Sequence, residues 1–138
     1  MAGKLPNSKL LIALLLVLLA SNLNAQVVMC FQEDNQNPRN PIRLKMTLSA
    51  SDPLTATVQY NKSENEILLS KISEKKLSTD VPVTTESKWL EKIGEKANGI
   101  YALTTRGAAV GALSYTRKDG KRFLFFDDPD CVASSGGK

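Results

Sequence analysis

The side chains that most often do chemistry in proteins are scarce in this sequence. Its 138 residues include no histidine and only two cysteines, Cys30 and Cys131. A Ser-His-Asp triad and a Cys-His dyad both need histidine, and the usual zinc sites need more sulfur or imidazole ligands than the chain contains. The composition excludes these classes of hydrolase and zinc protein, and we predict a protein that is not an enzyme and has no metal site or cofactor.

The acidic residues could form two other kinds of site. Asp127, Asp128 and Asp130 could supply oxygen ligands to calcium, but they lack the spacing and the distal glutamate of a known calcium loop. A solvated turn is the better interpretation of this run. Glycoside hydrolysis needs a defined pair of carboxylates, and no pair stands out among the 14 acidic residues. Neither chemistry is therefore predicted.

One glycine-rich stretch is the best candidate for a binding site. Its three glycines are Gly94, Gly99 and Gly107. They bracket Tyr101 and Arg106, and a loop, strand and loop of this kind could present a tyrosine and a cation to a partner. Ordinary turns explain the same glycines about as well.

The charge balance argues against a nucleic-acid partner. The whole chain has a formal charge of +4, and removal of an N-terminal segment that contains Lys4 and Lys9 lowers this charge to +2. Proteins that bind nucleic acids usually concentrate basic residues on one surface. The basic stretch 117–122 could bind an anionic polymer or a membrane surface. Such residues more often keep a strand edge soluble.

The N-terminus has the pattern of a secretory signal peptide. Lys4 and Lys9 precede an apolar run over residues 10–20, and the polar residues that follow end at Ala25, which suits cleavage. A membrane span would need about 20 apolar residues. We expect a signal peptide at 1–25, a β-domain at 26–131 and a flexible tail at 132–138. The protein would be periplasmic or secreted, without a transmembrane anchor after cleavage.

Alternation with a period of two predicts an antiparallel β-domain. Residues 42–48 alternate apolar with polar side chains, residues 54–60 repeat the pattern, and 66–72 form a third apolar stretch. Short turns between consecutive strands imply antiparallel pairing. Further strands are expected at 27–31, 100–105, 108–116 and 122–126, with a hairpin at Asp119-Gly120. These elements predict a mainly β protein, either a small antiparallel β-barrel or a sandwich-like meander.

One segment departs from the strand pattern. Its apolar residues have the spacing of one face of a helix: Trp89, Leu90, Ile93 and Ala97. Asn98 and the glycine after it would end such a helix, because both residues tolerate the left-handed conformation. We therefore expect one short helical insertion over residues 84–97, with Trp89 in the core rather than in a ligand platform.

The order of these features resembles the C-type lysozyme inhibitor family of periplasmic and membrane-bound bacterial proteins. The resemblance covers roughly residues 28–131. It rests on a cysteine in the first strand, a second cysteine after the last strand, and three segments between them: Val58-Gln59-Tyr60, Asn98-Gly99-Ile100-Tyr101 and Arg106-Gly107. It implies a small disulfide-linked β-barrel whose loops enter the cleft of a lysozyme and pair with its catalytic carboxylates.

The resemblance also implies which residues contact the partner. In the family's Ser-Gly-x-x-Tyr segment the glycine matches Gly94, with Ile93 in place of the serine. In its Tyr-x-x-x-x-Lys-Gly segment the matches are Tyr101, Arg106 and Gly107, with arginine in place of lysine. The expected function is an exported protein-binding domain, and specifically a lysozyme inhibitor. A periplasmic binding module and an accessory subunit of a cell-envelope assembly are the alternatives, and the oligomeric state is not predicted.

We predict that the exported protein begins near Gln26 and carries one disulfide between Cys30 and Cys131. Exported chains meet an oxidising environment, and neither cysteine has the C-x-x-C or histidine neighbours that activate a thiolate. Closing a loop of about 100 residues would stabilise the fold by about 2 to 4 kcal/mol. Mass spectrometry under non-reducing conditions measures both features. Two free thiols or a retained N-terminus would contradict the prediction.

Overall fold

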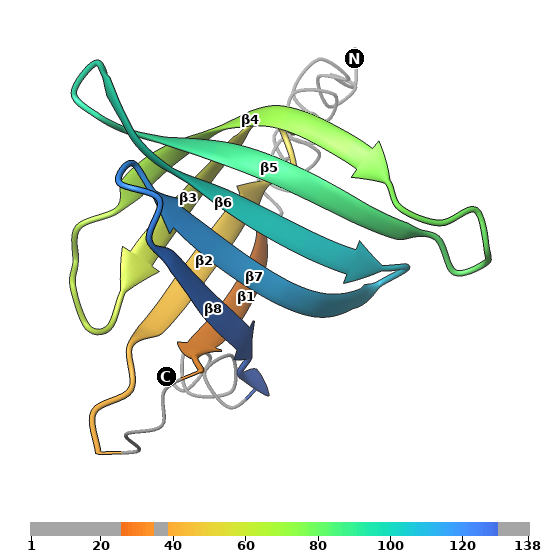
Figure 1. Ribbon diagram of the computed structural model, residues 1–138, viewed down its shortest axis with the longest axis horizontal. Helices are drawn as coiled ribbons and strands as arrows, with labels where there is room; N and C mark the ends of the chain where they lie inside the picture. Colours follow the sequence, from red (N-terminus) through yellow and green to blue (C-terminus); the bar gives the residue numbers. More distant parts are fainter. Residues whose placement is uncertain (1–25, 35–38, 130–138) are drawn as a thin grey trace, which may run out of the picture.

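The computed structural model describes residues 26–34 and 39–129, which fold into a closed antiparallel barrel (Figure 1). The strands are β1 (Gln26–Glu33), β2 (Arg43–Ser49), β3 (Thr55–Tyr60), β4 (Ile67–Lys76), β5 (Thr84–Ile93), β6 (Lys96–Arg106), β7 (Ala109–Arg117) and β8 (Arg122–Asp127). Each strand pairs with the next along the chain, and β8 pairs with β1 to close the barrel. The prediction of a mainly β antiparallel protein is therefore confirmed, and of the two predicted architectures the chain forms the barrel.

Several sequence predictions fall on segments outside the described residues. They concern the signal peptide at 1–25, Asp130 of the acidic run, Cys131 and the tail at 132–138. The disulfide between Cys30 and Cys131 therefore stays a prediction, as does the start of the mature chain. In the described part of the chain, no helix has the length and the apolar character needed to cross a membrane.

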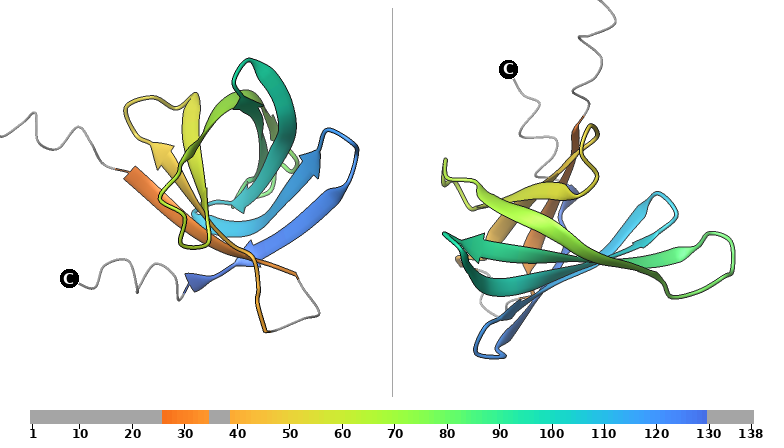
Figure 2. Two further views of the ribbon diagram at one scale, coloured as in Figure 1. Left: turned by 90° about the vertical axis from the view of Figure 1, so that its left-hand side faces the viewer. Right: turned by 90° about the horizontal axis from the view of Figure 1, so that it is seen from above.

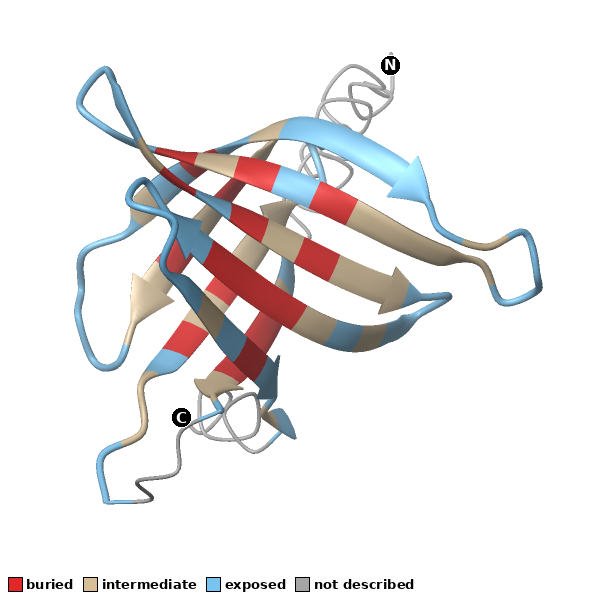
Figure 3. Cartoon of the chain, in the orientation of Figure 1, coloured by how far each residue is buried: buried red, intermediate tan, exposed pale blue. Residues whose placement is uncertain are grey.

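The alternation in β2 and β3 directs one row of side chains into the barrel. The inward side chains are buried or pack against the core: Ile42, Leu44, Met46, Leu48, Val58 and Tyr60. Among the outward side chains, Arg43 is exposed, and Lys45 and Thr57 are partly exposed. Figure 3 shows how buried and less buried positions alternate along the strands. The predicted facing of these two strands is confirmed.

The prediction of a helix over residues 84–97 is wrong, because this segment forms β5 and the start of β6. Within the described ranges 26–34 and 39–129 there is no helical element. Ser87, Trp89 and Glu91 are buried inside the barrel, whereas Lys88 and Lys92 are exposed. Two of the three inward side chains are polar, so β5 lacks the apolar alternation that identifies a strand in a sequence. The prediction that Trp89 lies in the core is correct, since only 3% of it is exposed.

The β4–β5 hairpin extends beyond the barrel wall. Strand β3 pairs with β4 only as far as Thr55 opposite Ser70, whereas β5 continues to pair with β4 as far as Thr85 opposite Lys76. The extension with its loop, residues 73–86, projects beyond the barrel (Figure 1 and Figure 2). We call it the arm. The end of the barrel with the arm and the β6–β7 turn is the arm end, and the end with the β5–β6 and β7–β8 turns is the hairpin end.

We predict that Leu44→Ala lowers the free energy of unfolding by about 2 to 5 kcal/mol, because it leaves a cavity in the core. Only 1% of Leu44 is exposed. Urea unfolding followed by the fluorescence of Trp89, the only tryptophan, measures the loss. Arg43→Ala, on the exposed face of the same strand, is the control and should change the free energy by less than about 0.5 kcal/mol. Equal effects of the two substitutions would contradict the facing of β2.

Candidate functional site

The structure places the predicted partner-binding residues in three different environments. Gly94 lies in the β5–β6 turn at the hairpin end. Arg106 and Gly107 lie at the opposite end of β6, beside the arm. Tyr101 lies between these two ends and points into the barrel, with 0% of its surface exposed. Of the four residues, only Arg106 and Gly107 therefore share one surface.

Arg106 and Gly107 lie against the loop of the arm and form one surface with it. The Gly107 N–H donates to the Val83 carbonyl at 3.0 Å, and a β-carbon added at Gly107 would lie 3.0 Å from the Pro82 Cβ. The φ angle of Gly107 is +59°, a conformation that strains other residues. Arg106 is exposed, and 91% of the Val81 surface is exposed. We call Val81, Pro82, Arg106 and Gly107 the tip.

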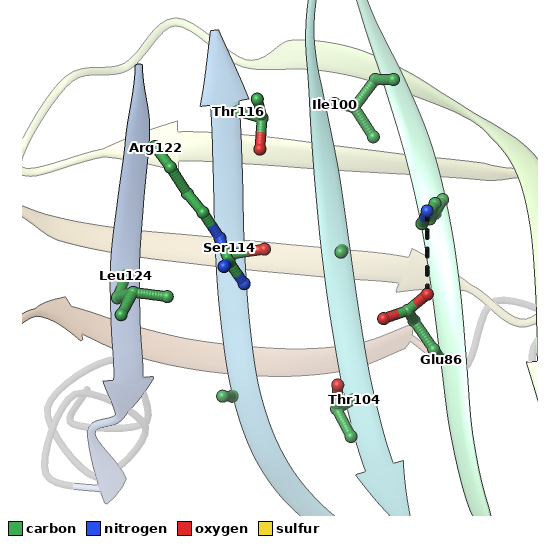
Figure 4. A pocket seen from close by; sticks show the side chains of 10 residues that line it. Glu86, Ile100, Thr104, Ser114, Thr116, Arg122 and Leu124 are labelled. Atoms are coloured by element: carbon green, nitrogen blue, oxygen red, sulfur yellow. Dashed lines mark ion pairs between the residues drawn. The ribbon is translucent and has the colours of Figure 1, made fainter. Parts of the chain in front are cut away.

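The outer face of β5 to β8 is hollowed (Figure 4). A cavity of about 420 Å³ lies there among small side chains such as Ala102 and Ser114 and the larger exposed Ile100 and Leu124. The Arg122 side chain extends from β8 across β7 toward Ser114 (Figure 4). This surface, which we call the outer hollow, combines apolar and charged groups as protein-binding surfaces do.

A buried carboxylate lies in the barrel interior toward the hairpin end. Glu91 on β5 is 3% exposed. Tyr101 donates its hydroxyl hydrogen to Glu91 Oε2 at 2.8 Å, and Glu91 Oε1 accepts from the Tyr115 hydroxyl at 3.2 Å and from the Asn98 amide at 2.5 Å. The Tyr60 and Tyr101 hydroxyls are 2.5 Å apart. These five residues form the Glu91 cluster, and no ion pair in the described part of the chain includes Glu91.

The direction of each hydrogen bond in the Glu91 cluster follows from the supply of hydrogens. A phenol has one hydroxyl hydrogen, and Tyr101 donates its own to Glu91, so Tyr60 must donate to the Tyr101 oxygen. Tyr115 donates to Glu91 and accepts from the Asn98 amide at 3.2 Å. Each chain of hydrogen bonds in the cluster therefore ends at the carboxylate.

The environment of the cluster raises the pKa of all three tyrosines. Burial is the largest cause for each one, and the negative charge of Glu91 adds to it. The pKa is raised to about 12 for Tyr60 and to about 12 for Tyr115. The pKa of Tyr101 lies far above its usual range. An ionised phenol would lose its donor hydrogen and place a second negative charge beside Glu91, so the phenols stay neutral at neutral pH.

The Glu91 cluster stabilises the interior and has no free nucleophile. Its carboxylate oxygens are already occupied by three donors. Among the described residues there is no group of three or more His, Cys, Asp and Glu side chains that could hold a metal ion. The Trp89 Nε1 is the buried side-chain polar atom of the described part that has no hydrogen-bond partner. The cluster's hydrogen bonds all lie within the barrel, so the exposed surfaces are the candidates for binding a partner.

Sequence reasoning did not identify Glu91 or Asn98 as important. No motif marks Glu91, and the sequence patterns mark Asn98 only as the end of the expected helix and as part of the resemblance; the positions of both in the interior depend on the registers of β5, β6 and β7. Three inward positions of β5 and β6 carry a polar or small residue where a barrel usually has an apolar side chain: Ser87, Glu91 and Gly99. In the sequence, these residues interrupt the apolar row, and this interruption is the signal that points to the cluster. Such residues in a small barrel need hydrogen-bond partners or a large side chain to pack against.

Comparison of the chain with protein-family models, with curated proteins and with solved protein structures finds no match. The resemblance to C-type lysozyme inhibitors therefore stays a hypothesis that rests on the sequence features given above. The geometry of the tip and of the outer hollow is the basis for the functional argument below.

We predict that the tyrosines of the folded protein do not ionise at pH 10. Their folded pKa values are raised, so the stability they contribute is fully present below the unfolded value of 10.0 and is lost as the pH rises toward about 12. All 3 tyrosines of the chain belong to the Glu91 cluster, so the ultraviolet absorbance of phenolate reports on the cluster alone. In urea, half of the tyrosines should ionise near pH 10. The same midpoint with and without urea would contradict the prediction.

Proposed function

We propose that the protein is an exported, non-catalytic binding protein that inserts the tip into a cleft of a protein partner. The observation that carries the proposal is that the arm projects beyond the barrel (Figure 1 and Figure 2), and that the exposed apolar Val81 in its loop shares the tip with the exposed cation Arg106 at its base. A large apolar side chain at the end of a projection gains contacts only when another molecule covers it. Apolar patches edged by charge are typical of protein interaction sites.

The tip is held in shape before any partner binds. The Leu77 N–H donates to the Thr84 carbonyl at 2.8 Å, and Gly107 is bonded to Val83 across the neighbouring turn. Thr84 itself pairs with Arg106, so β6 supports the base of the arm. A preformed loop loses less conformational freedom on binding than a flexible one, which favours affinity.

The outer hollow extends the proposed contact surface. Arg106 lies two residues beyond Thr104 on β6, and strand alternation places both side chains on the outer face. Glu86 is paired with Thr104 and also lines the outer hollow. A partner whose cleft receives the tip would therefore rest on the outer hollow and cover the exposed Ile100 and Leu124.

A C-type lysozyme is the first partner to test. The resemblance implies that the loop residue at position 106 faces catalytic carboxylates, and an arginine suits this role because its guanidinium can bind a carboxylate through two parallel hydrogen bonds. The predicted export would bring the protein into the compartment where lysozyme acts. Another protein of the cell envelope is the alternative partner, and it would use the same tip.

We predict that Arg106→Ala weakens lysozyme inhibition by more than tenfold. The loss of one member of a desolvated charge pair costs about 2 to 5 kcal/mol, and about 1.4 kcal/mol is one decade of affinity. Arg106→Lys should keep much of the activity, because the positive charge stays in place. A lysozyme assay over a salt series measures the inhibition. Arg43→Ala is the matched control, since it removes the same charge from an exposed position at the hairpin end.

The absence of inhibition by the wild type at micromolar concentration would exclude lysozyme as the partner. The tip would then be tested by capture of envelope proteins on the immobilised protein. A protein that binds the wild type and Arg43→Ala, but neither Arg106→Ala nor Val81→Ser, would support binding through the tip. Equal capture by all four proteins would contradict it.

A further inference from the structure

A second cavity opens at the hairpin end of the barrel, next to the Glu91 cluster. Its volume is about 190 Å³, and six side chains line it: Ile42, Tyr60, Tyr115, Arg117, Phe123 and Phe125. The mouth of a β-barrel is a common position for a small-molecule site. We call this cavity the cup. Cavities for drug-sized ligands are about 300 to 1,000 Å³, so the cup suits a smaller molecule.

The walls of the cup are mainly apolar. Phe125 is buried, Ile42 and Phe123 pack against the core, and the rings of Tyr115 and Phe123 stack with centroids 6.3 Å apart. The hydroxyl hydrogens of Tyr60 and Tyr115 point toward Tyr101 and Glu91 and are not available to a ligand. The inner part of the cup therefore offers contact area but no hydrogen-bond donor from these phenols.

The position of Glu91 decides which way a ligand with a polar head would lie. Its carboxylate is part of the cluster that includes Tyr60 and Tyr115, which also line the cup. A negatively charged head group placed deep in the cup would be repelled by Glu91, and it would lose water without gaining a donor. An anionic ligand would therefore bind with its apolar part inward and its charge at the mouth.

The β7–β8 hairpin supplies one cation that lines the cup and a second that lies against one of its walls. Arg117 lines the cup, and its side chain is 47% exposed. The Lys121 Nζ lies 5.2 Å from the centroid of the Phe123 ring. A positive charge on a ligand would be repelled by both groups, whereas a carboxylate would be attracted by both. The charge of these two groups thus selects for an anion.

Arg117 can exchange its present partner for a ligand. It donates from Nε and Nη2 to Asp119, and the guanidinium lowers the pKa of the Asp119 carboxyl to about 2. Both side chains are about half exposed, at 47% and 54%, so water weakens this ion pair. A guanidinium has five N–H donors, which leaves others free for a second carboxylate.

We propose that the cup binds a small monocarboxylate, with its alkyl or aryl body between Phe123, Phe125 and Ile42 and its carboxylate on Arg117 and Lys121. The site is independent of the proposed function, because the tip lies at the opposite end of the barrel. The chemical class is defined by the apolar walls, by the two cations of the β7–β8 hairpin and by the negative charge behind the walls.

Calorimetric titration of the mature protein with three probes of equal chain length tests the proposal: hexanoate, hexanol and hexylamine. Hexanoate should bind in a saturable manner and about tenfold or more tighter than hexylamine, because only the carboxylate pairs with the cations. Arg117→Ala should weaken hexanoate binding about tenfold and hexanol binding much less, because the alcohol forms no ion pair with the guanidinium. Asp119→Asn should strengthen hexanoate binding about threefold, because Arg117 loses its competing carboxylate.

Arg122→Ala is the matched control for Arg117→Ala. Arg122 lies on the same hairpin and carries the same charge, but it lines the outer hollow instead of the cup. It should leave hexanoate binding nearly unchanged. Hexylamine binding as tight as hexanoate, equal losses for Arg117→Ala and Arg122→Ala, or no saturable binding of hexanoate at millimolar concentration would each overturn the proposal.

Discussion

The burial of the Glu91 carboxylate is the constraint on which the barrel interior depends. A carboxylate removed from water costs several kcal/mol unless hydrogen bonds replace the lost hydration. Here the donors come from both β6 and β7, and Tyr60 on β3 supports Tyr101 from behind. Strands β3 and β6 are not neighbours in the sheet, so the bond between Tyr60 and Tyr101 crosses the interior. A change in any one of these side chains would remove at least one hydrogen bond from a buried polar group, so the cluster ties opposite walls of the barrel together.

Gly99 is what allows this arrangement to form. It pairs with Glu91 across β5 and β6, and a β-carbon at Gly99 would overlap the ring and hydroxyl of Tyr115. The Tyr115 ring therefore occupies the space above the Gly99 backbone, with its centroid 4.5 Å from that of Tyr101. A shift of one residue between β5 and β6 would turn Glu91 outward and place a larger side chain under Tyr115. The cluster thereby fixes the register of three strands, and these strands carry the tip and the outer hollow.

The predictability of each element from the sequence depends on which side chains point inward. Strands β2 and β3 have apolar residues at every inward position, and their alternation predicts them correctly. Strand β5 has Ser87 and Glu91 at inward positions, so the remaining apolar residues happen to match a helical spacing. Gly99 suggests the end of that helix, whereas its role is to make room for a ring. The sequence analysis expected Tyr101 and Arg106 to be presented to a partner. Arg106 is exposed, whereas Tyr101 is buried because it lies in the same inward row of β6 as Leu103. Tertiary pairing, which no local pattern contains, decides these cases.

The two ends of the barrel differ in the chemistry they can present. At the arm end, an extension that β3 does not cover carries apolar and cationic groups away from the barrel, a shape that fits into a concave surface. At the hairpin end, the walls recede around the cup, a shape that receives a smaller molecule. The interior between them is filled by the side chains of Met46, Leu69 and Leu103, which are at most 3% exposed, and by the Glu91 cluster. Strands β6 and β7 run from one end to the other, so a ligand in the cup could influence the tip only by moving these strands. Because the Glu91 cluster holds both of them in register, the barrel keeps its two surfaces independent.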